Sequence, residues 1–171
     1  MRFEQHDFED EAFFAVSILN SANPIMLGGG GVDGAIHMAA GPRLLEECRK
    51  VKSTNGIRCP FGEARITTAG NLNCKYVIHT AGPIYDRERG SAQVLKNSYI
   101  NSLNLALENN CSSIAFTAIS CGAYGYPPDE AAEISLAVCN QDMYKDLQII
   151  FYLFGREIVE IWQAEFSDLS E

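Results

Sequence analysis

Residues 20–37 read NSANPIMLGGGGVDGAIH, with four consecutive glycines between an apolar strand pattern and a helical pattern. Each glycine costs about 0.5–1 kcal/mol of backbone entropy relative to alanine, so the run is unfavourable unless it has a use. Glycines let a ligand approach the backbone closely, and amides at the start of a helix bind anions. The flanking Met26, Leu27 and Val32 are apolar, which disfavours a flexible linker. We therefore predict a phosphate-binding loop at Gly28, Gly29, Gly30 and Gly31.

Beyond this loop the chain alternates short β-rich apolar runs with longer helical patterns, which is typical of an α/β fold. We predict strands at residues 13–19, 64–68, 76–80, 113–118 and 147–154. We predict helices at residues 32–40, 43–50, 92–108, 130–139 and 156–166. Several strands are apolar on both faces, as buried parallel strands are. The pattern predicts one domain over residues 1–171, a three-layer α/β/α sandwich with a mixed, largely parallel central sheet.

A second unusual segment, ISCGAYGYPP at residues 119–128, follows the strand predicted at 113–118. Its glycines and small residues suit a loop around a diphosphate, and Tyr124 offers an aromatic face to a sugar or a ring. An ordinary tight turn is the alternative. Because ligands of open α/β sheets bind beyond the carboxyl ends of the strands, we expect the two loops to meet at one crevice.

Composition and missing patterns exclude several classes of protein. Thirteen basic and 22 acidic side chains give a formal net charge of −9, which opposes the counterion-release binding of nucleic-acid proteins. The glycine loop matches neither the GxGxxG pattern of dinucleotide enzymes nor a P-loop. The apolar runs fall far short of the roughly 20 residues that span a bilayer, and residues 1–14 lack a signal-peptide layout. We expect neither a membrane nor a nucleic-acid partner.

The cysteines, at positions 48, 59, 74, 111, 121 and 139, contain no CxxC pair. A chain of this length does not need disulfides to hold its core. Free thiols in a reducing cytoplasm are the simplest interpretation, so we expect a cytoplasmic protein without a metal or a cofactor.

Several motifs in order resemble the macrodomain family, and within it the MacroD-type hydrolases and their bacterial relatives. They are NSAN at 20–23, LGGGGVDGAIHMAAG at 27–41, GEA at 62–64, YVIHTAGP at 76–83 and SCGAYGYP at 120–127. The resemblance covers most of the chain from residue 19 to residue 154. It implies a macrodomain fold and a pocket for ADP-ribose.

The resemblance also implies a role for particular residues. It places Asn23 and Asp33 beside the distal ribose as the catalytic pair, and Asn20 in the same segment of the ligand site. Asp7 is the best match for the residue that binds the adenine amino group, with Glu9 or Asp10 as alternatives. The aromatic that packs on adenine corresponds to Phe154. The diphosphate contacts that it implies, besides the glycine loop, are Val32, Ser120, Cys121, Gly122, Ala123 and Tyr124.

Side-chain chemistry allows both a catalytic and a structural role for the pair. Asp33 falls in the first turn of a helix, where it could orient or deprotonate a water or simply stabilise the helix dipole. Only one carboxylate is present where ordinary glycosidases use two, so we expect a phosphate or hydroxyl of the substrate to assist. The Asn23 amide could fix ribose hydroxyls or close the turn after the strand.

Other polar residues near these motifs have structural interpretations. We expect Asn20 to hold its turn through backbone hydrogen bonds and His79 to be a structural strand residue. His37 lies one helical turn after Asp33 and could tune it, although a packed histidine is the stronger interpretation. Cys121 has no histidine near it in the sequence, so a nucleophilic role is disfavoured.

The resulting hypothesis is a hydrolase that removes ADP-ribose from mono-ADP-ribosylated acidic side chains, deacetylates O-acetyl-ADP-ribose, or does both. Its partners would be ADP-ribose and ADP-ribosylated proteins or O-acetyl-ADP-ribose, and we expect it to be a monomer. One alternative is a reader module that binds ADP-ribose without turnover. Another is a phosphatase acting on ADP-ribose 1″-phosphate in the same pocket.

Overall fold

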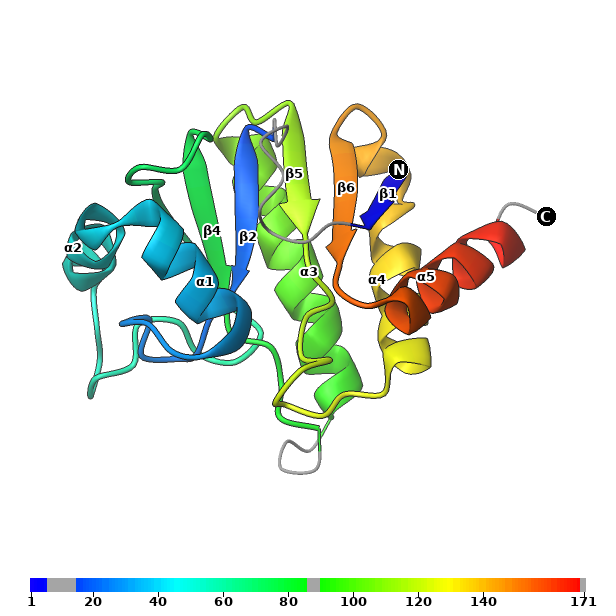
Figure 1. The fold of residues 1–171 in the computed structure, drawn as a ribbon, viewed down its shortest axis with the longest axis horizontal. Helices are drawn as coiled ribbons and strands as arrows, with labels where there is room; N and C mark the ends of the chain where they lie inside the picture. The colour runs from blue at the N-terminus through cyan, green and yellow to red at the C-terminus, as the bar shows by residue number, and fades with distance from the viewer. Residues whose placement is uncertain (6–14, 86–89, 170–171) are drawn as a thin grey trace.

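A computed structural model describes residues 1–5, 15–85 and 90–169 of the chain. Its strands are β1 (Arg2–Gln5), β2 (Ser17–Ser21), β3 (Ala64–Thr68), β4 (Tyr76–Thr80), β5 (Ser113–Phe116) and β6 (Gln148–Leu153). Its helices are α1 (Gly31–Ala40), α2 (Pro42–Lys50), α3 (Ser91–Glu108), α4 (Pro128–Cys139) and α5 (Arg156–Asp168), with a short 3-10 helix at Asp142–Tyr144. Figure 1 shows helices on both sides of a twisted sheet.

The predicted strands and helices are present, but some boundaries were wrong. The strand expected at 13–19 runs from Ser17 to Ser21, so Asn20 lies inside the sheet, not in the turn after it. The cause is pairing: this strand stays in register with β4 through the pair Ser21 and Thr80. The strand expected at 113–118 ends at Phe116, and the short edge strand β1 was not predicted.

The strands form one mixed sheet in the order β1-β6-β5-β2-β4-β3. Neighbouring strands are parallel except for the edge strand β3, which runs antiparallel to β4. This confirms the predicted mixed, largely parallel sheet.

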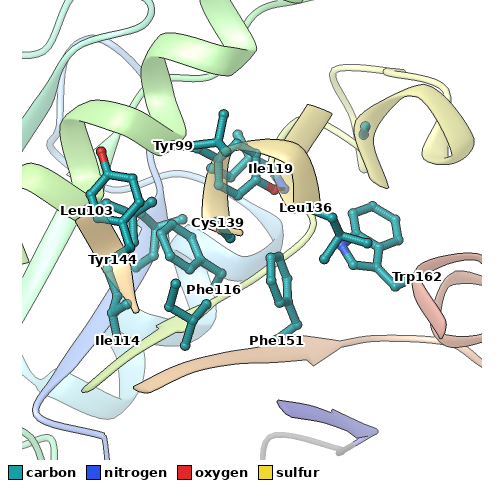
Figure 2. Packing of buried hydrophobic residues seen from close by; sticks show 14 of the residues in the cluster. Tyr99, Leu103, Ile114, Phe116, Ile119, Leu136, Cys139, Tyr144, Phe151 and Trp162 are labelled. Atoms are coloured by element: carbon teal, nitrogen blue, oxygen red, sulfur yellow. Dashed lines mark hydrogen bonds between the residues drawn. The ribbon is translucent and has the colours of Figure 1, made fainter. Parts of the chain in front are cut away.

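Two buried clusters lie on the two faces of the sheet, because successive side chains of a strand point to opposite faces. In β4, Val77 packs in the cluster that contains residues of α1 and α2, while Ile78 packs in the cluster that contains residues of α3, α4 and α5. In the second cluster the Phe116 and Phe151 rings stack with centroids 5.8 Å apart, and Trp162 of α5 lies beside them (Figure 2). The arrangement confirms the three-layer sandwich.

The two unusual loops leave the sheet at the same edge. β2 and β5 are parallel neighbours, so the glycine loop after β2 and the loop after β5 both start from carboxyl ends of strands. Both loops lie at the lower edge of the sheet in Figure 1. In the part of the chain that the structure describes, no helix is long and apolar enough to cross a membrane.

Candidate active site

The glycine loop leads directly into helix α1, whose first residue is Gly31 and whose N-terminal cap is Gly30. Gly28 and Gly31 have φ angles of 90° and 58°, values that favour glycine. Gly30 has a φ of −100°, and a Cβ built on it would meet no atom within 4 Å. Neither backbone strain nor packing against the described residues therefore requires glycine at position 30. Close approach of a ligand to the start of the helix would account for it.

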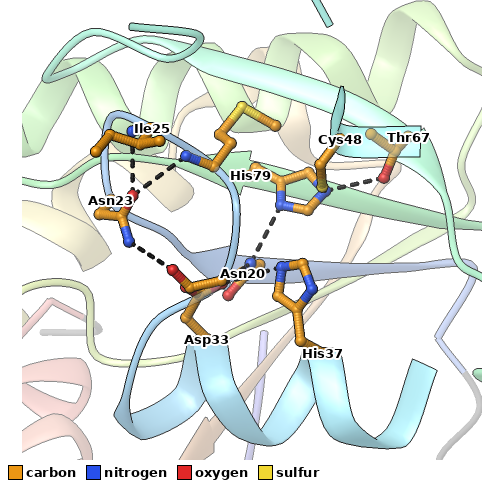
Figure 3. Close-up of polar contacts among 10 residues, drawn as sticks. Asn20, Asn23, Ile25, Asp33, His37, Cys48, Thr67 and His79 are labelled. Atoms are coloured by element: carbon orange, nitrogen blue, oxygen red, sulfur yellow. Dashed lines mark hydrogen bonds and ion pairs between the residues drawn. The ribbon is translucent and has the colours of Figure 1, made fainter. Parts of the chain in front are cut away.

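Asp33 lies in the first turn of α1 and is 4% exposed. Its Oδ1 accepts a hydrogen bond of 2.7 Å from the Asn20 amide and lies 3.5 Å from His37 Nε2 (Figure 3). Its Oδ2 is buried and has no hydrogen-bond partner among the described residues. A buried carboxylate oxygen without a partner is costly in a folded protein, and a bound water or substrate hydroxyl would satisfy it.

Asn20 is fully buried behind Asp33. Its backbone carbonyl accepts from Ala22 N, as expected for a residue that holds the turn, but its side chain does more. Asn20 Nδ2 contacts both Asp33 Oδ1 and, at 3.1 Å, His79 Nδ1 of the neighbouring strand. The structure thus gives Asn20 a role in orienting Asp33 that the sequence did not indicate. Its contact with a ligand stays a prediction.

The side chain of Asn23 holds the loop that follows β2. Its Oδ1 accepts from the backbone N–H groups of Ile25 and Met26 at 3.1 and 3.2 Å, and its Nδ2 donates to Gly28 O at 3.1 Å. The structural role considered for Asn23 is therefore present. One Nδ2 hydrogen has no partner among these contacts, so a role at the ribose remains open to it.

Asn23 and Asp33 converge on Gly29. A Cβ built on this glycine would lie 2.9 Å from Asp33 Oδ2 and 3.1 Å from Asn23 Nδ2. Both groups therefore lie against the side of Gly29 that a side chain would occupy, next to the exposed glycines of the loop. An amide donor and an unpartnered carboxylate oxygen side by side can bind a hydroxyl and a water together.

The second loop is closed by its own backbone, with Tyr126 N donating to Ser120 O at 2.9 Å and Gly125 N donating to Gly122 O. Ser120 has a φ of 66°, which is unusual for a residue other than glycine and is typical of functional loops. Gly122 and Ala123 are exposed, as contacts to a ligand would require.

Tyr124 connects the two loops electrostatically. Burial raises the pKa of its hydroxyl, and the negative charge of Asp33 raises that pKa further. Its ring is half-buried and lies edge-on to Phe61, with centroids 6.5 Å apart. The effect of Asp33 on the pKa of Tyr124 is as expected if the two loops meet at one crevice, and a shared site stays a prediction.

Cys121 is a poor nucleophile in this position. Burial raises the pKa of its thiol to about 12, so the thiolate is scarce near neutral pH. This agrees with the expectation that Cys121 is a small loop residue. All six cysteines are free, and the described residues contain no cluster of three or more His, Cys, Asp or Glu that could hold a metal ion.

Of the residues expected at the adenine, Phe154 lies in the described part of the chain. Phe154 follows β6 directly and is 71% exposed, so its ring is free to stack on a base at the same edge of the sheet. Asp7 and its alternatives Glu9 and Asp10 lie outside the described residues. These adenine contacts, like the contacts expected of Val32, stay predictions.

His79 should make the stability of the protein depend on pH. Burial, and to a smaller extent the charge of His37, lowers the pKa of His79 to about 3, whereas an unfolded histidine titrates near 6.5. Between these values the unfolded state binds the extra proton, so stability is lost as the pH falls. We expect the free energy of unfolding to drop by up to about 1.4 kcal/mol per pH unit from this residue.

Urea unfolding of the wild type and of His79→Asn at pH 7, 5.5 and 4.5 measures this contribution. The carboxylates titrate in both proteins, so the difference between the two slopes belongs to His79. Parallel slopes would contradict the expected shift.

Comparisons with known proteins all indicate one family. The model of the Macro domain family matches residues 19–135. The chain is 60% identical over 147 residues to a Macro domain-containing protein of Vibrio parahaemolyticus, covering 86% of each chain. It is 50% identical over 151 residues to an O-acetyl-ADP-ribose deacetylase of Citrobacter rodentium, covering 86% of this chain and 85% of the relative.

A solved macrodomain structure also has a fold similar to that of this chain. A mutant of the Oceanobacillus iheyensis macrodomain with ADPR superposes with a TM-score of 0.88 at 36% identity, over 98% of this chain and 92% of the other.

Proposed function

This chain belongs to the Macro domain family, and we propose that it binds ADP-ribose and hydrolyses O-acetyl-ADP-ribose to acetate and ADP-ribose. A relative at 50% identity is named as an O-acetyl-ADP-ribose deacetylase, and a similar solved macrodomain is described with ADPR. We extend the proposal to ADP-ribose esters of acidic side chains in proteins, because they carry the same kind of bond at the distal ribose.

One observation supports hydrolysis above all others. Asp33 Oδ2 is buried and unpartnered among the described residues, and it borders the same space as the Asn23 amide. A module that only binds the diphosphate has no need of a free carboxylate oxygen there. A water bound to that oxygen would be oriented and polarised for attack.

The proposed chemistry needs no covalent intermediate. The oxygen of the bound water forms a bond to the carbonyl carbon of the ester as Asp33 Oδ2 takes a proton from that water, and the acyl C–O bond then breaks. The departing ribose oxygen takes up the proton that Asp33 received, which restores the carboxylate. Because one carboxylate serves where glycosidases use two, we expect a phosphate or hydroxyl of the substrate to assist this last transfer.

The diphosphate would bind at the start of α1. The exposed backbone of Gly29, Gly30 and Gly31 and the positive end of the helix dipole favour an anion there. The loop from Ser120 to Tyr124 would close over it from the neighbouring strand. Local amides can bind a diphosphate even though the net charge of the chain is −9, since the attraction acts within a turn of the helix end.

We also propose that the protein works as a single-domain monomer in the cytoplasm, with ADP-ribosylated proteins as partners. The free cysteines support a reducing compartment. The alternatives are a reader of ADP-ribose and a phosphatase of ADP-ribose 1″-phosphate, which would use the same pocket.

One assay separates these activities. Purified protein is incubated in parallel with O-acetyl-ADP-ribose, with a mono-ADP-ribosylated protein and with ADP-ribose 1″-phosphate, and acetate, ADP-ribose and phosphate are quantified. We expect turnover of the first two substrates. Tight binding of ADP-ribose with no product from any substrate would assign the protein to the readers, and phosphate release alone would assign it to the phosphatases.

A further inference from the structure

We propose that His79 and Thr67 are positioning residues for the reaction, because they determine through Asn20 which oxygen of Asp33 is held and which is free. The inference rests on the proposed hydrolase function, since it concerns the same carboxylate. The residues come from four elements that meet behind the site: β3, β4, β2 and α1 (Figure 3).

A single nitrogen atom connects Asp33 to the network. Asn20 Nδ2 lies 2.7 Å from Asp33 Oδ1 and 3.1 Å from His79 Nδ1. An amide nitrogen carries two hydrogens, so it can donate to both atoms. The reversed amide would place Asn20 Oδ1 against the carboxylate oxygen, which is repulsive. The Asn20 amide therefore has one favourable orientation, and it requires His79 Nδ1 to accept.

That requirement also determines where His79 carries its proton. A ring that accepts at Nδ1 and is neutral is protonated at Nε2. His79 Nε2 lies 2.9 Å from Thr67 Oγ1, which accepts its hydrogen bond, and 3.8 Å from Cys48 Sγ. A proton on Nδ1 would face the N–H of Asn20, donor against donor. One tautomer alone satisfies the contacts on both sides of the ring.

The network is rigid as well as specific. Asn20 and His79 are fully buried, and Thr67 is 7% exposed. Asn20 and His79 are also direct partners in the parallel register of β2 and β4, so the sheet itself sets their spacing. With Oδ1 of Asp33 held from behind, Oδ2 lies on the side of Gly29, 2.9 Å from where a Cβ of residue 29 would be.

Loss of the acceptor at His79 Nδ1 should therefore change how the Asp33 carboxylate is held. One N–H of Asn20 would be left unpaired in the interior, and the amide would rotate to find a partner. Asp33 Oδ1 would then lose its donor, and the carboxylate would gain freedom. Small misplacements of a reacting group lower turnover while contacts to the rest of the substrate are kept.

Ring nitrogen NMR tests the tautomer directly. The chain has three histidines, so the signals of a protein labelled with 15N-histidine can be assigned by substitution. At pH 7 we expect His79 to be neutral and protonated at Nε2. A ring protonated at Nδ1, or at both nitrogens, would overturn the proposal.

Matched substitutions test the effect on the reaction. In His79→Asn the amide oxygen replaces the Nδ1 acceptor, whereas in His79→Gln the amide reaches only the Nε2 position. We expect the Gln variant to lower kcat about tenfold or more and the Asn variant to stay within about threefold of the wild type. Affinity for ADP-ribose, measured by calorimetry, should be unchanged in both, because the diphosphate loops are intact.

A second pair of variants, at Thr67, tests the proposal even if the buried histidine variants do not fold. Thr67→Val keeps the shape but removes the acceptor for Nε2–H, while Thr67→Ser keeps it. We expect kcat to fall several-fold in the Val variant alone, with thermal unfolding used to confirm that both are folded. Equal kcat values for Val and Ser, or for Gln and Asn at position 79, would overturn the proposal. Absence of turnover in the wild type would instead refute the hydrolase function, and the NMR result would still test the tautomer.

Discussion

Asp33→Asn should lose turnover of O-acetyl-ADP-ribose by about 10²-fold or more, because general base catalysis contributes on that scale. The substituted amide has the same shape, and its Oδ1 can still accept from Asn20, which donates at 2.7 Å in the wild type. What changes is the free oxygen, which becomes an N–H donor unable to take a proton from water. We expect the affinity for ADP-ribose to change by only a few fold, since the phosphate loops are untouched.

The control for this experiment is Asp129→Asn. Asp129 is also an acidic residue in the first turn of a helix, α4, but it is exposed. Its substitution removes a similar helix-dipole interaction without affecting the site. Turnover by Asp33→Asn at the rate of the wild type would show that Asp33 only stabilises its helix.

Gly29→Ala should have the second largest effect, because its methyl group would lie against both Asn23 and Asp33. The added Cβ would lie 2.9 Å from Asp33 Oδ2 and 3.1 Å from Asn23 Nδ2, distances that force at least one side chain to move. We expect kcat/KM to fall about 10²-fold, as displacement of a reacting group by around 1 Å does. Steady-state kinetics with O-acetyl-ADP-ribose measures this loss.

Gly30→Ala is the matched control in the same loop. A Cβ there meets no atom of residues 1–5, 15–85 or 90–169 within 4 Å, and the φ of −100° suits alanine. We expect kcat at saturating substrate to stay within a few fold of the wild type, while any loss of ADP-ribose affinity would report contact of the ligand with this glycine. Equal kcat losses in the two variants would contradict a specific role for the space beside Gly29.

The fold was largely predictable because its signals are local. Apolar runs with buried faces indicated the strands from β2 to β6, and helical periodicity indicated α1 to α5. The errors occurred where pairing decides the boundary. Pairing with β4 extends β2 to Ser21. The short β1 is a strand because it pairs in parallel with β6.

The site, too, could be predicted from the sequence only in part. The glycine loop could be recognised from its own sequence, since the entropic cost of four glycines needs a function to offset it. The order of motifs that resembles a macrodomain predicted Asn23 and Asp33 as the catalytic pair. Their convergence on Gly29 could not be read from the chain, because it depends on how residues 23–28 turn back.

By itself the sequence determined the class of fold, and it predicted the phosphate-binding loop and the pair Asn23 and Asp33 from local pattern and from the resemblance to macrodomains. Only the tertiary structure decided how Asp33 is held. Its oxygens are distinguished by Asn20 and His79, which are 59 residues apart in the chain and meet only because β2 and β4 pair in parallel. Hydrogen bonds of this kind are set by strand register, and register is a property of the assembled sheet.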